Sequence, residues 1–344
     1  MKTILITGGA GFIGSNFVRH LHGRYPAYRL IVLDALTYAG AVENLPPEFR
    51  DGGNEQFVFW YGNVRNAELV DTLMAQSDVV VHFAAETHVT RSIYDNQLFF
   101  ETDVLGTQVV ANSALKHLDR IERFIHISSS EVYGTAHAPL MTEDHPLMPM
   151  SPYAAAKAGA DRLTYSYWET YGIPVVIVRP FNNYGPFQHL EKAVPRFITS
   201  CILDEPLRVH GDGRAARDWL HVEDTCEALD RVLHVELDRI KGETINLGCG
   251  VSHDIVTVAQ MIVDKMSKPE GLITYIGDRP GQVFRHTASV EKAARLLDWH
   301  PKTAFTDGLD KTIAWYRGNR PWWEKQLWMR NIPIVTKQGK RELH

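Results

Sequence analysis

The sequence predicts an α/β fold, a doubly wound parallel sheet followed by a smaller α/β lobe. Short apolar runs rich in β-branched residues alternate with helix-length amphipathic segments through the first half of the chain. A glycine-rich loop directly follows the first of these runs. After about residue 182 the alternation loosens, with more Pro and Gly and longer irregular connections. Repeated strand–helix alternation produces parallel sheets with right-handed crossovers, so the first half should form the sheet.

The apolar runs and the segments between them define the expected elements. Buried strands are expected at 3–7, 29–33, 57–61, 79–83 and 124–128, and helices at 12–22, 67–76 and 98–117. A further helix begins near Pro152, because proline is tolerated in a first helical turn, and it leads into a strand at 175–179. We expect a sheet domain over 1–181, a substrate lobe over 182–330 from which segments can return to the first domain, and a surface tail over 331–344.

Composition excludes several classes of protein. The chain has 344 residues, of which 44% are hydrophobic and 22% charged, as in ordinary globular proteins. A net charge of -5 gives no reason to expect nucleic acid or an anionic membrane as a partner. No stretch approaches the ~20 apolar residues of a membrane span. The short apolar run at the N-terminus is typical of a core strand and not of a signal peptide. Three widely spaced cysteines predict neither a disulfide framework nor a metal site, so we expect a cytoplasmic protein without metal.

The glycine loop TGGAGFIG predicts a dinucleotide site. Gly8, Gly11 and Gly14 lie between a buried strand and an amphipathic helix that begins with Phe12 and Ile13. Such glycines permit a tight turn, close approach of a pyrophosphate and close helix–strand packing, which is the Rossmann arrangement. Asp34 ends the second strand, where a carboxylate accepts hydrogen bonds from ribose hydroxyls and repels a 2′-phosphate. The basic Arg29 lies at the start of that strand and not after it, so the cofactor is predicted to be NAD rather than NADP.

A tyrosine and a lysine suggest the chemistry. Tyr153 and Lys157 are four residues apart in a helical stretch, so both project from one face. An ammonium near a phenol lowers the phenol pKa, and the phenol can then accept a hydroxyl proton while hydride passes to nicotinamide. A serine-rich strand end, Ser128, Ser129 and Ser130, precedes this helix.

These motifs occur with HFAAETHVTRSI, SSEVYG, SPYAAAKAGAD, RPFNNYGP, EKAVPRFI and RDWLHVEDTCEAL, in that order. The chain thereby resembles, over nearly its whole length, the extended short-chain dehydrogenase/reductases that modify nucleotide sugars, and among them the NDP-hexose 4,6-dehydratases. The resemblance implies a UDP- or dTDP-hexose substrate. It also implies a homodimer formed by a four-helix bundle, here from segments 98–117 and 152–171.

The resemblance also implies roles for individual residues. Further residues implied to contact the cofactor are Asn63, Val64, Ala84 and Ser128. Asn63 occupies a position where the family usually has Asp. The residues implied to bind the substrate diphosphate and sugar are His88, Asn182, Lys192, Arg217 and Arg279.

The implied reaction oxidises C4 through Tyr153, removes the C5 proton through Glu131 and eliminates water from C6. The sequence departs from the family here, with Ser129-Ser130-Glu131 in place of Thr-Asp-Glu. Ser129 keeps the hydroxyl expected to hold the 4-oxygen, but Ser130 replaces the acid that protonates the leaving hydroxyl and could only relay a proton through water. Gln282 likewise replaces a common His.

Two other reactions share the C4 oxidation and stay open at this stage. A UDP-glucuronate decarboxylase would need a cation on the substrate carboxylate, for which Arg285 is the nearest candidate. A nucleotide-sugar 4-epimerase needs only the first step. A non-catalytic NAD-binding sensor is disfavoured, because Tyr153 and Lys157 are both present. The overall motif set favours the 4,6-dehydratase.

Overall fold

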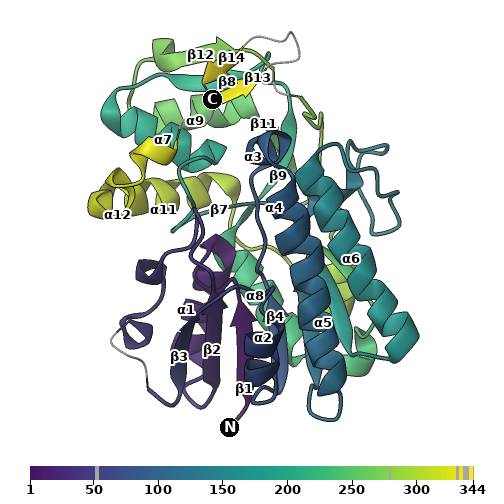
Figure 1. The fold of residues 1–344 in the computed structure, drawn as a ribbon. Helices are drawn as coiled ribbons and strands as arrows, with labels where there is room; N and C mark the ends of the chain where they lie inside the picture. The colour runs from purple at the N-terminus through teal and green to yellow at the C-terminus, as the bar shows by residue number, and fades with distance from the viewer. Residues whose placement is uncertain (51–53, 279, 331–332, 336–340, 344) are drawn as a thin grey trace.

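The computed structural model describes residues 1–50, 54–278, 280–330, 333–335 and 341–343. The chain forms a lobe built on a large sheet, with a smaller lobe at the carboxyl edge of that sheet (Figure 1). No helix in these ranges combines the length and the apolar character that a membrane crossing requires.

The large sheet is parallel throughout, with the strand order β10-β6-β5-β4-β1-β2-β3. Its strands are β1 (Thr3–Thr7), β2 (Arg29–Asp34), β3 (Phe57–Tyr61), β4 (Val79–His82), β5 (Arg123–Ile127), β6 (Val175–Pro180) and β10 (Thr244–Leu247). The expected strands agree with these bounds to within a residue, and the predicted doubly wound Rossmann sheet is confirmed. The order reverses between β1 and β4, where such folds place their ligands.

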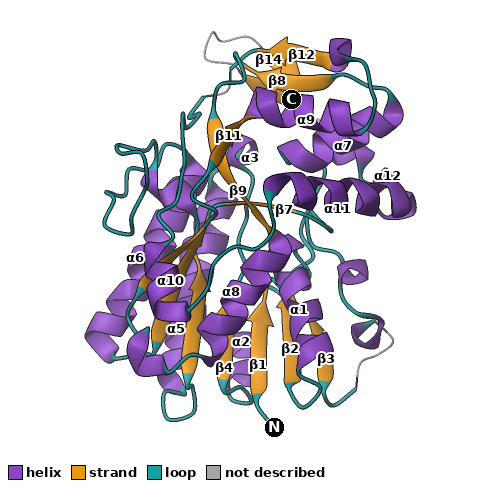
Figure 2. Cartoon of the chain, turned by 180° about the vertical axis from the view of Figure 1, so that it is seen from behind, coloured by secondary structure: helices purple, strands orange, loops and turns teal. Residues whose placement is uncertain are grey.

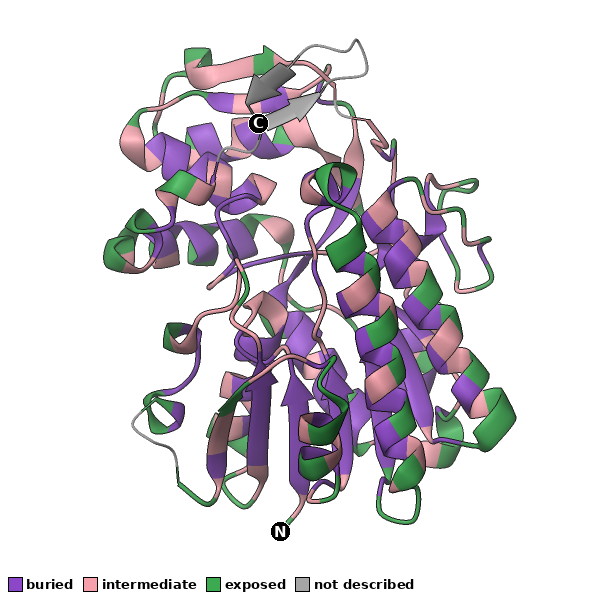
Figure 3. Ribbon diagram, in the orientation of Figure 1, coloured by how far each residue is buried: buried purple, intermediate pink, exposed green. Residues whose placement is uncertain are grey.

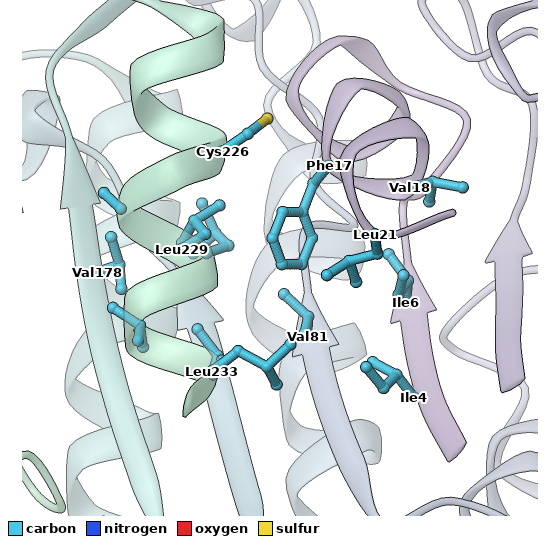
Figure 4. Packing of buried hydrophobic residues seen from close by; sticks show 14 of the residues in the cluster. Ile4, Ile6, Phe17, Val18, Leu21, Val81, Val178, Cys226, Leu229 and Leu233 are labelled. Atoms are coloured by element: carbon cyan, nitrogen blue, oxygen red, sulfur yellow. The ribbon is translucent and has the colours of Figure 1, made fainter. Parts of the chain in front are cut away.

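Helices cover both faces of this sheet. On one face lie α2 (Ala67–Met74), α5 (Gly106–Lys116) and α6 (Pro152–Tyr171), and on the other α1 (Phe12–Arg24), α8 (Val222–His234) and α10 (Glu291–Leu297) (Figures 1 and 2). Ile4 and Ile6 pack with Phe17 of α1, whereas Leu5 joins the cluster on the opposite face. Alternate residues of β1 therefore supply two separate cores, as expected for a strand buried on both sides. Figure 4 shows the first core, with Leu229 and Leu233 of α8 beside Phe17.

The expected helix 98–117 is interrupted. The structure divides it into α4 (Gln97–Phe99), a π-helical segment η3 (Phe100–Leu105) and α5. The widened turn brings Asp103 into the interior, where the residue is 1% exposed. Segments of π-helix occur often at functional sites, and η3 packs against α6, which carries Tyr153 and Lys157.

The smaller lobe has its own core around Tyr184, Phe197, Trp219 and Trp323. Its strands are β7 (Asn182–Tyr184), β8 (Leu207–His210), β9 (Ala216–His221), β11 (Ser252–Asp254) and β12 (Ile273–Ile276), and its helices are α7 (Ala193–Leu203), α9 (Ile255–Lys265), α11 (Phe305–Gly318) and α12 (Arg320–Glu324). Short 3-10 turns occur at Val42–Asn44, Pro47–Phe49, Leu237–Arg239, Glu270–Leu272 and Leu327–Met329. The chain crosses between lobes more than once, because β10 pairs with β6 in the large sheet.

The C-terminal stretch contains a strand pair. β13 (Pro333–Val335) pairs antiparallel with β14 (Arg341–Leu343). The rest of the expected surface tail, residues 331–332, 336–340 and 344, lies outside the described residues.

Candidate active site

The glycine loop forms a tight cradle at the point where the strand order reverses. Gly8 has a φ of +70°, and a Cβ there would lie 2.5 Å from the Ala84 nitrogen at the end of β4. A Cβ on Gly14 would lie 2.3 Å from the Gly8 oxygen. At Gly11, by contrast, a Cβ would meet only the Gly8 oxygen, at 3.3 Å, and would otherwise project into open space before α1. The first main-chain N–H groups of α1 are thus accessible to a pyrophosphate, and the cradle fits a dinucleotide.

Asp34 lies at the end of β2, beside this loop. Its two carboxylate oxygens accept hydrogen bonds from the main-chain nitrogens of Ala10, at 2.9 Å, and Leu36, at 2.8 Å. Burial raises the pKa of the Asp34 carboxyl, while these main-chain donors oppose the rise. Arg29, at the other end of β2, donates to the Glu55 carbonyl oxygen. Among the described residues, no cation shifts the pKa of Asp34. A fixed carboxylate of this kind suits a ribose diol and not a 2′-phosphate, so the residues fit NAD.

The other expected cofactor residues follow the strand ends. Asn63 accepts a hydrogen bond from the Arg65 main chain after β3, and the adjacent Val64 is buried in the core. Ala84 follows β4, where its nitrogen lies 3.4 Å from the Thr7 hydroxyl. The Ser128 hydroxyl, after β5, donates to Asp161 at 2.6 Å. Its side chain is therefore turned into the protein, a placement that its sequence motif does not reveal.

Helix α6 aligns the expected catalytic pair with a third residue. Ser151 caps the helix by accepting from the Ala154 nitrogen, and Pro152 occupies its first turn as predicted. Tyr153, Lys157 and Asp161 follow at intervals of four residues, so they share one buried face of the helix. This face points towards the carboxyl end of β5, because the Lys157 ammonium donates to the Ile127 carbonyl oxygen at 2.7 Å.

The phenol pKa in the structure differs from the expectation. Burial raises the pKa of Tyr153, and a hydrogen bond with Ser129 lowers it only in part. Lys157 is not among the groups that shift this pKa in the structure, since its ammonium donates to the Ile127 carbonyl oxygen. The expected lowering by Lys157 stays a prediction for the complex with NAD and substrate. The close Tyr153–Ser129 contact nevertheless places a hydroxyl beside the phenol.

Asp103 is a site residue that the sequence analysis missed. Its carboxylate accepts from the Glu86 nitrogen at 2.8 Å and electrostatically faces Lys157. Burial raises the pKa of Asp103 to about 7, against the opposing effect of Lys157, and burial likewise lowers the pKa of Lys157. The only available indication was a charged residue within an otherwise apolar helix face.

The serine run continues into a short 3-10 turn, η4 (Ser130–Tyr133). The Ser129 hydroxyl caps this turn by accepting from the Glu131 nitrogen at 3.2 Å. Ser129 thus links Glu131 to Tyr153, and the three residues lie together at the carboxyl edge of β5. The Ser130 hydroxyl lies 3.4 Å from His286 Nδ1. No sequence pattern had singled out His286.

Basic side chains surround one buried carboxylate near the glycine loop. Glu191 is contacted by His88 Nε2 at 3.3 Å, by Arg91 Nε at 3.5 Å and by Lys192 Nζ at 3.4 Å. Burial acts to raise the pKa of Glu191, but the neighbouring cations hold it below its usual range. His88 and Lys192, both expected to bind substrate, are therefore close together. The motif EKAVPRFI contains Glu191 but does not reveal that Glu191 is their shared partner.

The remaining expected substrate residues lie mainly in the smaller lobe. Asn182 begins β7, and Arg217 lies in β9, where the residue is 4% exposed and its guanidinium donates to the Ala216 oxygen. Arg285 runs beside β9, and its guanidinium donates to the Ala138 carbonyl oxygen at 3.1 Å. Arg279 lies outside the described residues. Across the ranges that the structure describes, no group of His, Cys, Asp and Glu side chains could hold a metal ion.

A buried ion pair joins β6 to helix α6, which carries Tyr153 and Lys157. Arg179 Nε and Nη2 donate to the two carboxylate oxygens of Asp161 at 2.8 and 2.9 Å. Arg179 Nη1 also donates to the Tyr133 hydroxyl, which donates in turn to Asn246. The network connects α6, η4 and two strands of the sheet, and it includes Ser128.

A glycine cradle, an acidic ribose acceptor and a Tyr–Lys pair on one edge of a doubly wound sheet define an NAD-binding enzyme of the extended short-chain dehydrogenase/reductase class. The family model described as GDP-mannose 4,6 dehydratase matches residues 5–312. The chain therefore belongs to this family of nucleotide-sugar 4,6-dehydratases.

Individual relatives agree with the family. A dTDP-glucose 4,6-dehydratase of Streptomyces niveus is 43% identical over 93% of this chain and 94% of that protein. The low-salt glycan biosynthesis protein Agl12 of Haloferax volcanii is 44% identical over 92% of this chain and 99% of that protein. Among solved structures, the dTDP-glucose 4,6-dehydratase DesIV of Streptomyces venezuelae, with NAD bound, has a TM-score of 0.88 and 40% identity, covering 94% of this chain and 99% of that one.

Proposed function

We propose that the protein is an NAD-dependent NDP-hexose 4,6-dehydratase that converts a UDP- or dTDP-hexose into the NDP-4-keto-6-deoxyhexose. One observation carries the proposal: the Ser129 hydroxyl, which accepts from the Glu131 main-chain nitrogen, and the charge of the Glu131 carboxylate both act on the Tyr153 phenol, at the sheet edge that holds the glycine cradle. An epimerase needs only the phenol, whereas a carboxylate beside it can take a second proton from the sugar. The similarity to dTDP-glucose 4,6-dehydratases over nearly the whole chain supports the same reaction.

The chemistry follows from this arrangement. Bound NAD supplies the acceptor for the C4 hydride and later returns that hydride to C6. Tyr153 accepts the proton of the 4-hydroxyl, and the Ser129 hydroxyl holds the 4-oxygen in place. The C4 ketone acidifies the C5 proton, which the Glu131 carboxylate removes. In the complex with NAD and substrate, the positive charge of Lys157 would favour ionised Tyr153, against the burial that raises the phenol pKa in the structure.

We assign substrate binding to the basic groups near the cradle and in the smaller lobe. Lys192 and Arg217 would donate charge-assisted hydrogen bonds to the diphosphate. His88 and Asn182 would contact the sugar, and Arg285 would contact the substrate from beside β9. In this arrangement residues 1–181 chiefly hold the cofactor and 182–330 chiefly hold the substrate.

Isotope transfer tests the reaction class directly. With an NDP-hexose deuterated at C4, the proposal predicts a product lighter by one water that carries the label at C6. In deuterated water the product should gain one solvent deuteron at C5. Loss of carbon dioxide from an NDP-hexuronate, with the label retained at C4, would instead identify a decarboxylase. An unchanged mass with inverted C4 would identify an epimerase.

Assembly and location are further proposals. Leu98, Phe100 and Leu105 on the α4–η3 segment are 38%, 42% and 52% exposed, and exposed positions continue along α5 and α6 (Figure 3). These apolar side chains support a homodimer through a four-helix bundle of α5 and α6 with their copies. Light scattering should then give twice the chain mass, and Leu105→Glu should shift it towards the monomer. We also infer a cytoplasmic location, where the three free thiols would stay reduced.

A further inference from the structure

We propose that Ser130 and His286 act together as the proton donor to the departing C6 hydroxyl, replacing the carboxylic acid expected at position 130. The inference rests on the proposed 4,6-dehydration. The Ser130 hydroxyl lies 3.4 Å from His286 Nδ1, although 156 positions separate the two residues in sequence. Ser130 directly precedes Glu131, the proposed C5 base, so its hydroxyl belongs to the same turn as the elimination chemistry.

The imidazole of His286 is held in one orientation. Its main-chain nitrogen donates to the Ala216 oxygen at 3.1 Å, and its ring packs edge-on against Phe181 with centroids 6.0 Å apart. Nε2 lies 2.6 Å from the Gly134 carbonyl oxygen. A carbonyl can only accept, so Nε2 carries a proton and Nδ1 is the nitrogen left to exchange one with Ser130. His286 is fully buried and Ser130 is 2% exposed, which limits competition from bulk water.

The charges around His286 couple its protonation to the substrate. Burial lowers the pKa of His286 to about 4, Glu131 raises it, and Arg217 and His145 lower it. Arg217 is also a proposed diphosphate ligand. Neutralising this guanidinium with a diphosphate removes a repulsive charge, so substrate binding favours the imidazolium. A bound diphosphate would thus raise the pKa of His286 from its lowered value, although burial, the main cause of the lowering, would remain.

The elimination balances as follows. Glu131 takes the C5 proton, and the C5–H electron pair forms the C5–C6 double bond. The C6–O bond breaks, and the departing oxygen takes the Ser130 hydroxyl proton while Ser130 receives the Nδ1 proton of the imidazolium. Water leaves, and C6 accepts the hydride that C4 gave up. The Glu131 carboxyl exchanges its proton with solvent, and C5 then recovers a proton from Glu131. Tyr153 then holds one proton more and His286 one fewer than at the start, and solvent exchange restores both before the next turnover.

A change of leaving group separates this role from a structural one. Fluoride leaves without needing a proton, so a 6-deoxy-6-fluoro NDP-hexose needs the C5 base but no acid. Ser130→Ala and His286→Gln should slow loss of water by about 10²–10⁴-fold, the usual contribution of a general acid. Both variants should release fluoride within a fewfold of the parent rate. The controls are Ser166→Ala and His300→Gln, at exposed positions away from the Ser130–His286 pair. Neither control should change the rate of water loss or of fluoride loss.

A rescue variant completes the design. Ser130→Asp supplies its own carboxylic acid, so adding His286→Gln to it should cost little, whereas His286→Gln alone is costly. Equal loss with both leaving groups, or water elimination at the parent rate in either single variant, would overturn the proposal. The absorbance of reduced nicotinamide reports C4 oxidation separately. If the parent protein shows no C4 oxidation with either substrate, it is the proposed dehydration that fails.

Discussion

The buried Asp161–Arg179 pair offers a prediction whose size follows from the geometry. The Asp161 and Arg179 side chains are 0% and 2% exposed. Asp161→Asn would leave the Arg179 guanidinium buried without its counter-charge. Breaking such a pair costs about 3–5 kcal/mol of unfolding free energy, and full burial means that solvent screening does not reduce it.

Arg162 provides a matched control on the same carboxylate. Its guanidinium lies 2.6 Å from Asp161, but its side chain is 44% exposed. Arg162→Met should therefore cost about 1 kcal/mol or less. The double variant Asp161→Asn/Arg179→Met removes the stranded charge and should recover much of the loss.

Urea unfolding followed by circular dichroism at neutral pH measures these differences from the transition midpoints. Burial alone would raise the pKa of Asp161, but Arg179 holds it below its usual range. The pair's contribution is therefore complete above the unfolded carboxyl pKa of about 3.9 and is lost only as pH falls towards the lower folded value. An Asp161→Asn variant no less stable than Arg162→Met, or a double variant that loses the sum of its single changes, would refute the reasoning.

Four further predictions concern the site. Glu131→Gln should still reduce the bound cofactor but stall there, so reduced nicotinamide should accumulate and no solvent deuterium should reach C5. Tyr153→Phe should lower cofactor reduction by about 10²–10⁴-fold, measured by stopped flow, with NAD binding unchanged because only the proton acceptor is lost. Asp34→Ala should weaken NAD binding by about 10–100-fold, as expected for losing a hydrogen bond to a charged group, and should narrow its preference over NADP in fluorescence titrations. The stability of Asp103→Asn relative to the parent should increase as pH rises from about 4 to about 7, because the raised folded pKa of Asp103 makes its ionisation oppose folding in that window. Thermal unfolding scans across pH measure this difference in stability, and a difference that does not change with pH would contradict the prediction.

The sequence by itself determined the features that depend on neighbours along the chain. Apolar runs such as Thr3–Thr7 match the strands of the sheet almost residue for residue, because strand and helix periodicity is a local property. The glycine spacing from Gly8 to Gly14 specified the cradle for the same reason, since only glycine fits that turn. The four-residue step from Tyr153 to Lys157 placed both on one helical face.

Only the tertiary structure decided which distant side chains meet. The π-helical turn that buries Asp103 and the approach of His286 to Ser130 depend on packing between segments far apart in sequence. The same holds for β10, which returns from the second half of the chain to pair with β6. Local periodicity carries no information about these pairings. They form only when the whole chain has folded, because segments far apart in sequence then enclose one interior.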